Sequence, residues 1–365
     1  MIIWTCGVTY GQLKNKYYHM KTLATLLVSG LILLSSCVIR TSNEQNGSYD
    51  YSDNEYSFIQ EYKVSSPANI DISTSGGNIS VYGTKSDSLE VSFIIRRRGK
   101  VIDMTLEELK KIADVEITSD SSRLSISIKK ISERFLSVGF NIKAPYETSA
   151  ILNTSGGNIK AEDLIGKQKI NTSGGNMHFD NLSGLVNAHT SGGNIKISHS
   201  IAEFDASTSG GNISLNDIQG KVKISTSGGN IDANGLEPEL NARTSGGNIH
   251  ISDVKGITDV NTSGGSIQLN NIYGSVKAYT SGGSVSATLN ELTGSLQLET
   301  SGGNISATIP SGLGMDLDLS ADHIDTKLQN FTGTSNKERI NGQMNGGGIP
   351  VRISTYGGSI DLNYQ

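Results

Sequence analysis

The sequence predicts an all-β protein, folded as a single-stranded, right-handed parallel β-helix (β-solenoid) with 18-residue coils. The tetrapeptide Thr-Ser-Gly-Gly occurs ten times, and eight successive copies, from Thr154 to Thr280, begin 18 residues apart. Between copies apolar and polar residues alternate, as strands require and helical repeats do not. The 365 residues include 43 Gly but only 5 Pro, which suits a chain made mostly of strands.

Each coil is expected to hold two short strands joined by bends. In the coil that begins at Thr208, Ile213 and Leu215 point inward from the first strand, and Val222 and Ile224 from the second. The paired glycines are expected at a corner, because Gly adopts positive φ easily and permits close backbone packing. Adjacent coils should stack at about 4.8 Å, and parallel strands favour right-handed connections.

Asn follows the paired glycines in eight copies. Stacked in register, these side chains would form either a hydrogen-bonded ladder that satisfies the turns or a polar stripe for a ligand. The ladder is the favoured interpretation. The predicted corner and ladder residues are Gly156, Gly157, Asn158, Gly174, Gly175, Asn176, Gly192, Gly193, Asn194, Gly210, Gly211, Asn212, Gly228, Gly229, Asn230, Gly246, Gly247 and Asn248.

The two ends of the repeat array differ from the regular solenoid, which is predicted over residues 154–365. Residues 56–153 hold one outlying copy of the corner and irregular strands, and are expected to form N-terminal capping coils. Thr105 and Glu108 have the spacing of a capping box, which predicts a short helix that covers the open first coil. Near the other end, residues 330–348 are predicted as a polar, glycine-rich loop before a closing coil.

The first 55 residues predict export and lipid anchoring. Lysines precede an apolar run from Leu23 to Leu34, which is followed by Ser-Ser-Cys. This pattern resembles a bacterial lipobox, in which the signal peptide, here residues 1–36, is cleaved and Cys37 receives acyl chains. Residues 37–55 are polar and are predicted to be a lipidated, flexible tether. The predicted partner of this segment is therefore the membrane.

Two alternatives remain open at the N-terminus. The segment could be an ordinary secretory signal with an incidental cysteine. If Met20 is the true start, residues 1–19 are a mis-called extension.

Charge and residue clustering argue against several function classes. The net charge of −5 argues against a nucleic-acid partner. No catalytic residue, cofactor or metal site is predicted, since outward carboxylates and basic residues are spread over the coils and the histidines are isolated. Calcium-binding nonapeptides and ice-binding Thr arrays fit the repeat poorly. Residues 96–98, three arginines, are expected as a solvated edge, with acidic glycans or lipid headgroups as alternative partners.

The reiterated T-S-G-G-N-I coil, the lipobox and the closing G-G-G-I-P-V-R-I-S-T-Y-G-G-S-I-D-L resemble the bacterial "putative adhesin" family of DUF4097 type over residues 56–365. Head domains of autotransporter adhesins form a related group. The resemblance implies a β-helix in the bacterial cell envelope and brings no catalytic residues. The lipoprotein form looks like those of Bacteroidetes. We therefore expect a lipoprotein of the outer membrane, with the periplasmic face slightly favoured over the cell surface.

The function predicted on this basis is that of a non-enzymatic, adhesin-like solenoid whose repetitive surface binds a glycan or an envelope protein. The alternative is a structural or envelope-stress-associated component without a dedicated ligand, and a carbohydrate-active enzyme is a distant third. Tyr273 and Tyr279 are the nearest candidates for stacking against a sugar ring.

Overall fold

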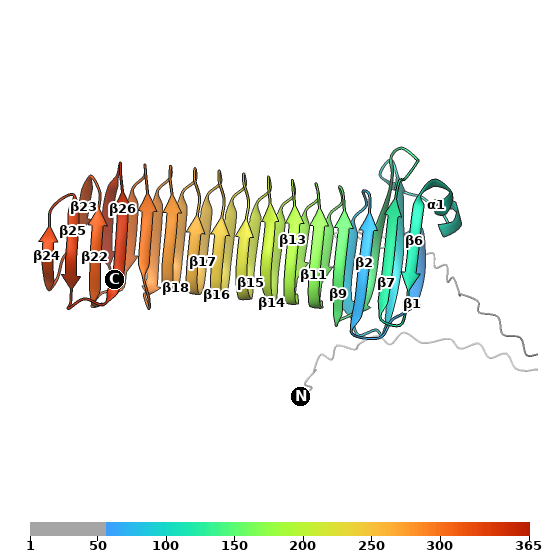
Figure 1. Cartoon of the computed structure of the whole chain (residues 1–365), viewed down its shortest axis with the longest axis horizontal. Coiled ribbons are helices and arrows are strands. Elements are labelled where there is room, and N and C mark those ends of the chain that lie inside the picture. The colour runs from blue at the N-terminus through green and yellow to red at the C-terminus, as the bar shows by residue number, and fades with distance from the viewer. Residues whose placement is uncertain (1–55) are drawn as a thin grey trace, which may run out of the picture. The chain divides into compact units, whose positions relative to one another are not determined.

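The computed structural model describes residues 56–365, which form 27 strands and one short helix. All strands join one continuous sheet that winds into stacked coils with two faces (Figure 1). This confirms the predicted all-β class. The first 55 residues, with the predicted signal peptide and Cys37, lie outside the described residues.

The central coils consist of parallel strands in strict register. Residues eighteen positions apart are partners, as in the pairs Ile213 with Ile231 and Ile231 with Ile249. Each coil contributes a strand to face B after its Thr-Ser-Gly-Gly corner and a strand to face A before the next corner. The central strands are β9 (Thr148–Thr154), β10 (Ile159–Glu162), β11 (Ile165–Thr172), β12 (Met177–Asp180), β13 (Ser183–Thr190), β14 (Ile195–Thr208), β15 (Ile213–Ser225), β16 (Ile231–Arg243), β17 (Ile249–Asn261), β18 (Ile267–Thr280), β19 (Val285–Glu291), β20 (Leu296–Thr300) and β21 (Ile305–Ile309).

Aliphatic side chains fill the space between the two faces. In the coil that begins at Thr208, Ile213, Leu215, Val222 and Ile224 are all buried, as the alternation predicts. One apolar cluster runs through all the coils. The expected insertion before Thr300 appears as two register shifts between β18 and β19.

At the N-terminal end, the chain does not stack in sequence order. The strands here are β1 (Phe58–Lys63), β2 (Ala68–Thr74), β3 (Ile79–Thr84), β4 (Ser88–Arg97), β5 (Lys100–Val101), β6 (Asp114–Ser119), β7 (Arg123–Lys129) and β8 (Leu136–Pro145). The coil β2–β3 lies between the coil β7–β8 and the coil β9–β10. The outlying corner at Thr74 is therefore in register with the repeat, although about 80 residues separate it in sequence from the next copy.

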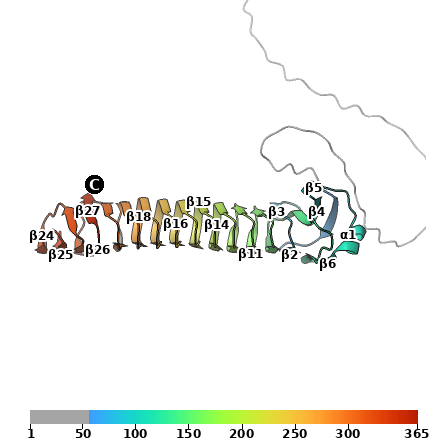
Figure 2. The same ribbon diagram turned by 90° about the horizontal axis from the view of Figure 1, so that it is seen from above.

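Antiparallel strands cover the outer edge of this first coil. β6 pairs with β7 on face A, while β4 pairs with β8 on face B and is covered in turn by β1. The predicted helix is present as α1 (Leu106–Ile112), with both hydrogen bonds of the capping box between Thr105 and Glu108. It lies at this end of the stack (Figure 2), and its Leu109 is fully buried.

The C-terminal end repeats the same device. Its strands are β22 (Met315–Ser320), β23 (His323–Thr326), β24 (Phe331–Ser335), β25 (Arg339–Met344), β26 (Ile349–Thr355) and β27 (Ser359–Tyr364). The last coil in sequence, β26–β27, lies between the coil β20–β21 and the coil β22–β23.

The prediction of a loop over residues 330–348 is wrong. β24 and β25 form an antiparallel hairpin there, which extends face A beyond β22. The glycines that suggested a loop include Gly333 and Gly342, which are direct partners in the hairpin. The Phe331 ring packs over both of them, so that an aromatic side chain occupies the space their missing side chains leave.

Candidate functional site

The predicted corner residues divide into two structural roles. The second glycine of each pair, such as Gly229, is buried, whereas the first, such as Gly228, is exposed. A Cβ on Gly229 would stand 2.8 Å from the Asn212 nitrogen and closer still to the Gly211 carbonyl oxygen in the coil beneath. A Cβ on Gly228 would meet nothing closer than 3.8 Å. Close stacking of backbones therefore requires the second glycine only.

Positive φ is not the reason for these glycines. None of the corner pairs in the described coils has positive φ. The left-handed residues lie at the bend that follows each face B strand, where Asp163, Asn181, Asp217 and Asp253 have φ between 51° and 58°. Asn and Asp tolerate this conformation better than other residues with side chains.

The corner threonines form a buried ladder that sequence analysis did not assign. The Thr244 hydroxyl donates to the Gly229 carbonyl at 2.9 Å and accepts from the Gly247 amide at 3.3 Å. The same pair of bonds recurs along the stack, so each hydroxyl connects its own corner to the one beneath. The repeated Thr before two glycines was the available signal, because a hydroxyl at a corner can serve two backbone groups at once.

The Asn side chains follow the stack on its exposed side. The Asn176 amide donates to Asn158 Oδ1 at 2.8 Å, and the Asn194 amide donates to Asn176 Oδ1 at 2.8 Å. This series continues to Ser266. Each side-chain oxygen is thus used by the backbone of the next coil, which leaves the amide NH₂ group as the outward donor.

Face A carries a shallow hollow of about 440 Å³ near the C-terminal end. It lies over β20, β26, β22 and β25, so the hairpin that replaces the predicted loop supplies one side of it. Alternation places every second side chain of these strands outward. The polar residues that line it are Ser295, Gln297, Asp316, Asp318, Asn341, Gln343 and Arg352.

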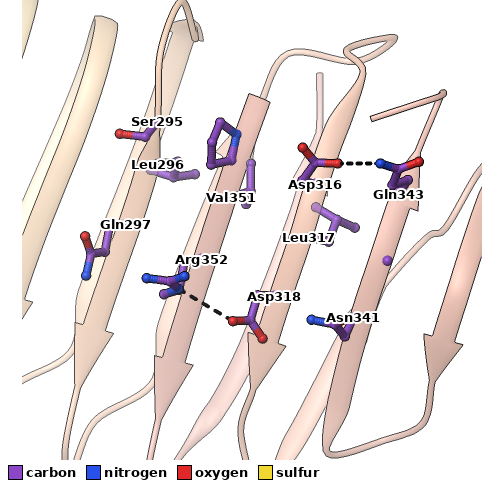
Figure 3. Close-up of a pocket in the computed structure, with 12 residues that line it drawn as sticks. Ser295, Leu296, Gln297, Asp316, Leu317, Asp318, Asn341, Gln343, Val351 and Arg352 are labelled. Carbon is purple, nitrogen blue, oxygen red and sulfur yellow. Dashed lines mark hydrogen bonds and ion pairs between the residues drawn. The ribbon is translucent and has the colours of Figure 1, made fainter. Parts of the chain in front are cut away.

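One row across the hollow carries both charges. Gln297, Arg352, Asp318 and Asn341 are direct register partners on the four strands (Figure 3). Arg352 Nε lies 3.5 Å from Asp318 Oδ2. Arg339 Nη2 lies 4.0 Å from the other carboxylate oxygen, Oδ1. These side chains are exposed, so the ion pairs orient the row more than they stabilise the fold.

Asp316 forms the second polar centre of the hollow. Gln343 Nε2 donates to Asp316 Oδ1 at 3.1 Å (Figure 3), and the Gly348 amide donates to Oδ2 at 3.3 Å. A Cβ on Gly347 would stand 2.6 Å from Asp316 Oδ1. The glycine-rich turn after β25 therefore fits closely around this carboxylate and fixes it.

A second depression of about 320 Å³ adjoins the hollow and shares Gln297 with it. Its lining includes Asn261, Lys277, Tyr279 and Glu299. Tyr279 is half-buried on face A, so part of its ring is open to a ligand. Tyr273, the other aromatic candidate, lies six residues earlier in β18 beside the bend, where its hydroxyl accepts from Asn290 at 2.8 Å. The structure therefore brings only Tyr279 to the hollow.

The hollow offers hydrogen-bonding groups rather than catalytic ones. Carboxylate and amide oxygens accept from hydroxyl groups, while the amide NH₂ groups and the Arg352 guanidinium donate to them. A general acid such as that of a glycosidase needs a carboxyl group in apolar surroundings. Asp316 and Asp318 instead lie among amides and a guanidinium. This chemistry suits a hydroxyl-rich ligand that is bound but not cleaved.

Within residues 56–365, no group of three or more His, Cys, Asp or Glu side chains is placed to hold a metal ion. In the same part of the chain, no helix has the length and apolar character needed to span a membrane.

Comparison with known proteins defines the class of the fold. Residues 198–363, which include the whole hollow, match the model of the family described as Toastrack DUF4097. Over these residues the chain belongs to that family, in agreement with the resemblance of its repeat. No curated protein matches the sequence.

Three solved structures are similar over most of the chain. A "putative adhesin" from Bacteroides fragilis is 13% identical, covers 84% of this chain and 96% of its own, and has a TM-score of 0.29. A "putative adhesin" from Parabacteroides distasonis is 14% identical, covers 83% and 96%, and has a TM-score of 0.29. A "putative cell adhesion protein" from Clostridium sporogenes is 10% identical, covers 84% and 99%, and has a TM-score of 0.18.

Proposed function

We propose that this protein is a non-enzymatic, adhesin-like component of the bacterial cell envelope that binds a glycan in the hollow on face A. The observation that carries the proposal is the row Gln297, Arg352, Asp318 and Asn341, which sets donors and acceptors side by side on four strands. Neighbouring strands lie about 4.8 Å apart, a spacing that matches hydroxyl groups along a sugar chain. Tyr279 adds an aromatic surface beside the row, on which a sugar ring can stack.

The test is binding of the protein to an array of bacterial and host glycans, followed by calorimetry on the hits. A double variant, Asp318→Ala with Asn341→Ala, should weaken binding about 10- to 100-fold, because hydrogen bonds to charged groups are worth about 1.5–3 kcal/mol. The matched control is Asp205→Ala with Asn187→Ala. These two residues are also adjacent partners on face A, in coils far from the hollow.

Equal loss of binding in both double variants would place the ligand elsewhere on the face. Absence of any glycan ligand would favour the alternative, a structural or stress-associated envelope component without a dedicated ligand. Cleavage of a bound glycan would favour the third candidate, an enzyme.

We further propose that Cys37 is acylated and holds the protein on the outer membrane, and that the coil is right-handed, as parallel crossovers are. The Cys37→Ala variant should move from the membrane fraction to the soluble fraction of lysed cells. Protease treatment of intact cells would separate the periplasmic face, which we favour slightly, from the cell surface. A variant that stays in the membrane fraction would argue against the lipid anchor.

A further inference from the structure

The N-terminal end of the stack carries a concentrated positive charge in a protein whose net charge is −5. Two segments supply it: residues 96–100, at the turn between β4 and β5, and residues 129–135, which connect β7 to β8. Together they contain seven basic side chains and one acidic side chain. We call these two segments the basic tip.

The fold brings the two segments together although about 30 residues separate them. Arg97 is the register partner of Leu136, and the Arg98 amide donates to the Phe135 carbonyl at 2.9 Å. The Arg98 guanidinium lies 5.7 Å from the centre of the Phe135 ring. Phe135 is 68% exposed, which is unusual for a phenylalanine and sets an apolar ring among the cations.

Ion pairs inside the protein use only part of this charge. Arg97 pairs with Glu133 at 2.7 Å, and Lys130 pairs with Asp114 at 3.1 Å. Within the described residues, no carboxylate lies within 4.0 Å of the other five basic groups of the tip, which are Arg96, Arg98, Lys100, Lys129 and Arg134. A solvated edge that only deters strand pairing would need neither the second loop nor the exposed ring.

The chain enters the fold at the same place. The Ser57 amide donates to the Phe93 carbonyl at 2.8 Å, and the Ser57 hydroxyl donates to the Ile102 carbonyl at 2.7 Å. Both partners flank the turn of residues 96–100. Eighteen residues separate Tyr56 from Cys37, the proposed site of acylation. A lipid anchor at Cys37 would therefore hold the basic tip, and not the hollow, next to the bilayer.

We propose that the basic tip docks on the surface of an anionic phospholipid bilayer. The five free cations face the headgroups, and Phe135 enters the interface between headgroups and acyl chains. Each basic residue near an anionic surface contributes about 1 kcal/mol, and a basic patch strengthens an acyl anchor that is weak alone. The proposal does not depend on glycan binding, since the hollow lies at the opposite end of the stack (Figure 1).

The experiment is co-sedimentation of the full chain carrying Cys37→Ser, so that acylation contributes nothing, with vesicles of phosphatidylglycerol and phosphatidylethanolamine or of phosphatidylcholine alone. We expect binding to the anionic vesicles that falls steeply with salt, and little binding to the neutral ones. The triple variant Arg98→Gln, Lys100→Gln and Lys129→Gln should bind the anionic vesicles about a hundredfold more weakly. Phe135→Ser should weaken binding further without changing its salt dependence.

The matched control removes the same charge from the coils, as Lys169→Gln, Lys196→Gln and Lys255→Gln. The proposal is overturned if the control loses as much affinity as the tip variant, or if both bind like the parent chain. It is also overturned if the tip binds an acidic polysaccharide but no vesicle, because the partner would then be a glycan and not a lipid surface. Unchanged thermal unfolding of each variant would show that lost binding is not lost folding.

Discussion

At the scale of single residues, the repeat is a set of backbone solutions. The second glycine lets two corners approach, the threonine hydroxyl connects them, and the Asn oxygen serves the next amide. The most strictly repeated residues therefore carry the stacking, while the varied outward positions carry the contacts with other molecules. Only the ends of the array vary enough to form distinct sites.

The two glycines of one corner should respond very differently to a methyl group. Gly229→Ala places a Cβ 2.8 Å from the Asn212 nitrogen, and such overpacking costs about 1–3 kcal/mol. Gly228→Ala leaves at least 3.8 Å to its neighbours and should change stability by about 0.5 kcal/mol or less. Thermal unfolding of the two variants checks this, and similar melting temperatures would contradict the assigned roles.

Two buried threonines offer a second comparison with an opposite sign. Thr244→Val removes a hydroxyl that serves the Gly229 carbonyl and the Gly247 amide, and should cost about 1–3 kcal/mol. Thr258 is fully buried, and its hydroxyl has no hydrogen-bond partner among the described residues. Thr258→Val should therefore be neutral or stabilising. Denaturant unfolding measures both, and destabilisation by the second change would show that this hydroxyl has a partner.

At the scale of elements, the sequence predicted the coils well because each coil satisfies local rules. Alternation predicted the buried set, including Ile213 and Leu215, and capping-box spacing predicted α1. The ends could not be predicted in the same way. The place of β26 between β20 and β22 depends on pairing between segments that are distant in sequence, and no local pattern encodes it. For the same reason β25, and with it one side of the hollow, was predicted as a loop.

Helix α1 should be sensitive to acid through its capping box. Hydrogen bonds from the Thr105 amide and hydroxyl lower the pKa of Glu108 below its usual 4.5. A depressed pKa means that this stabilisation is complete above pH 4.5 and is lost as pH falls through the lower, folded value. Amide hydrogen exchange in residues 106–112, corrected for intrinsic rates, should therefore show more opening in that acidic range.

The control for this effect is Glu108→Gln, which keeps an acceptor oxygen at the same position but cannot titrate. Its exchange in the helix should lose the added acid dependence. An identical pH profile in both proteins would assign the effect to another group.

At the scale of the whole described unit, the two proposed surfaces lie at opposite ends of one stack (Figure 1). The basic tip lies beside β4 and β8, and the hollow lies over β20, β26, β22 and β25. The regular coils between them contribute a fixed separation, since each adds about 4.8 Å. Few contacts in a solenoid extend beyond neighbouring coils, so the number of coils can change without changing either end.

This independence predicts that whole coils can be removed. Deleting residues 226–243 joins Ser225 to Thr244 and restores the register that Ile213 would make with Ile249. The shortened protein should fold, keep glycan and vesicle binding, and lose about 5 Å of length in small-angle X-ray scattering.

Deleting residues 226–242 removes one residue fewer and leaves Arg243 as an extra residue before the next corner. A slip of one residue turns the inward side chains of a strand outward, so this variant should unfold at a much lower temperature or aggregate. The comparison tests the coil length directly, because a stack with any other repeat would not distinguish the two deletions in this direction. If both variants were equally stable, the coils would not be held by the 18-residue register that the Thr, Gly and Asn ladders share.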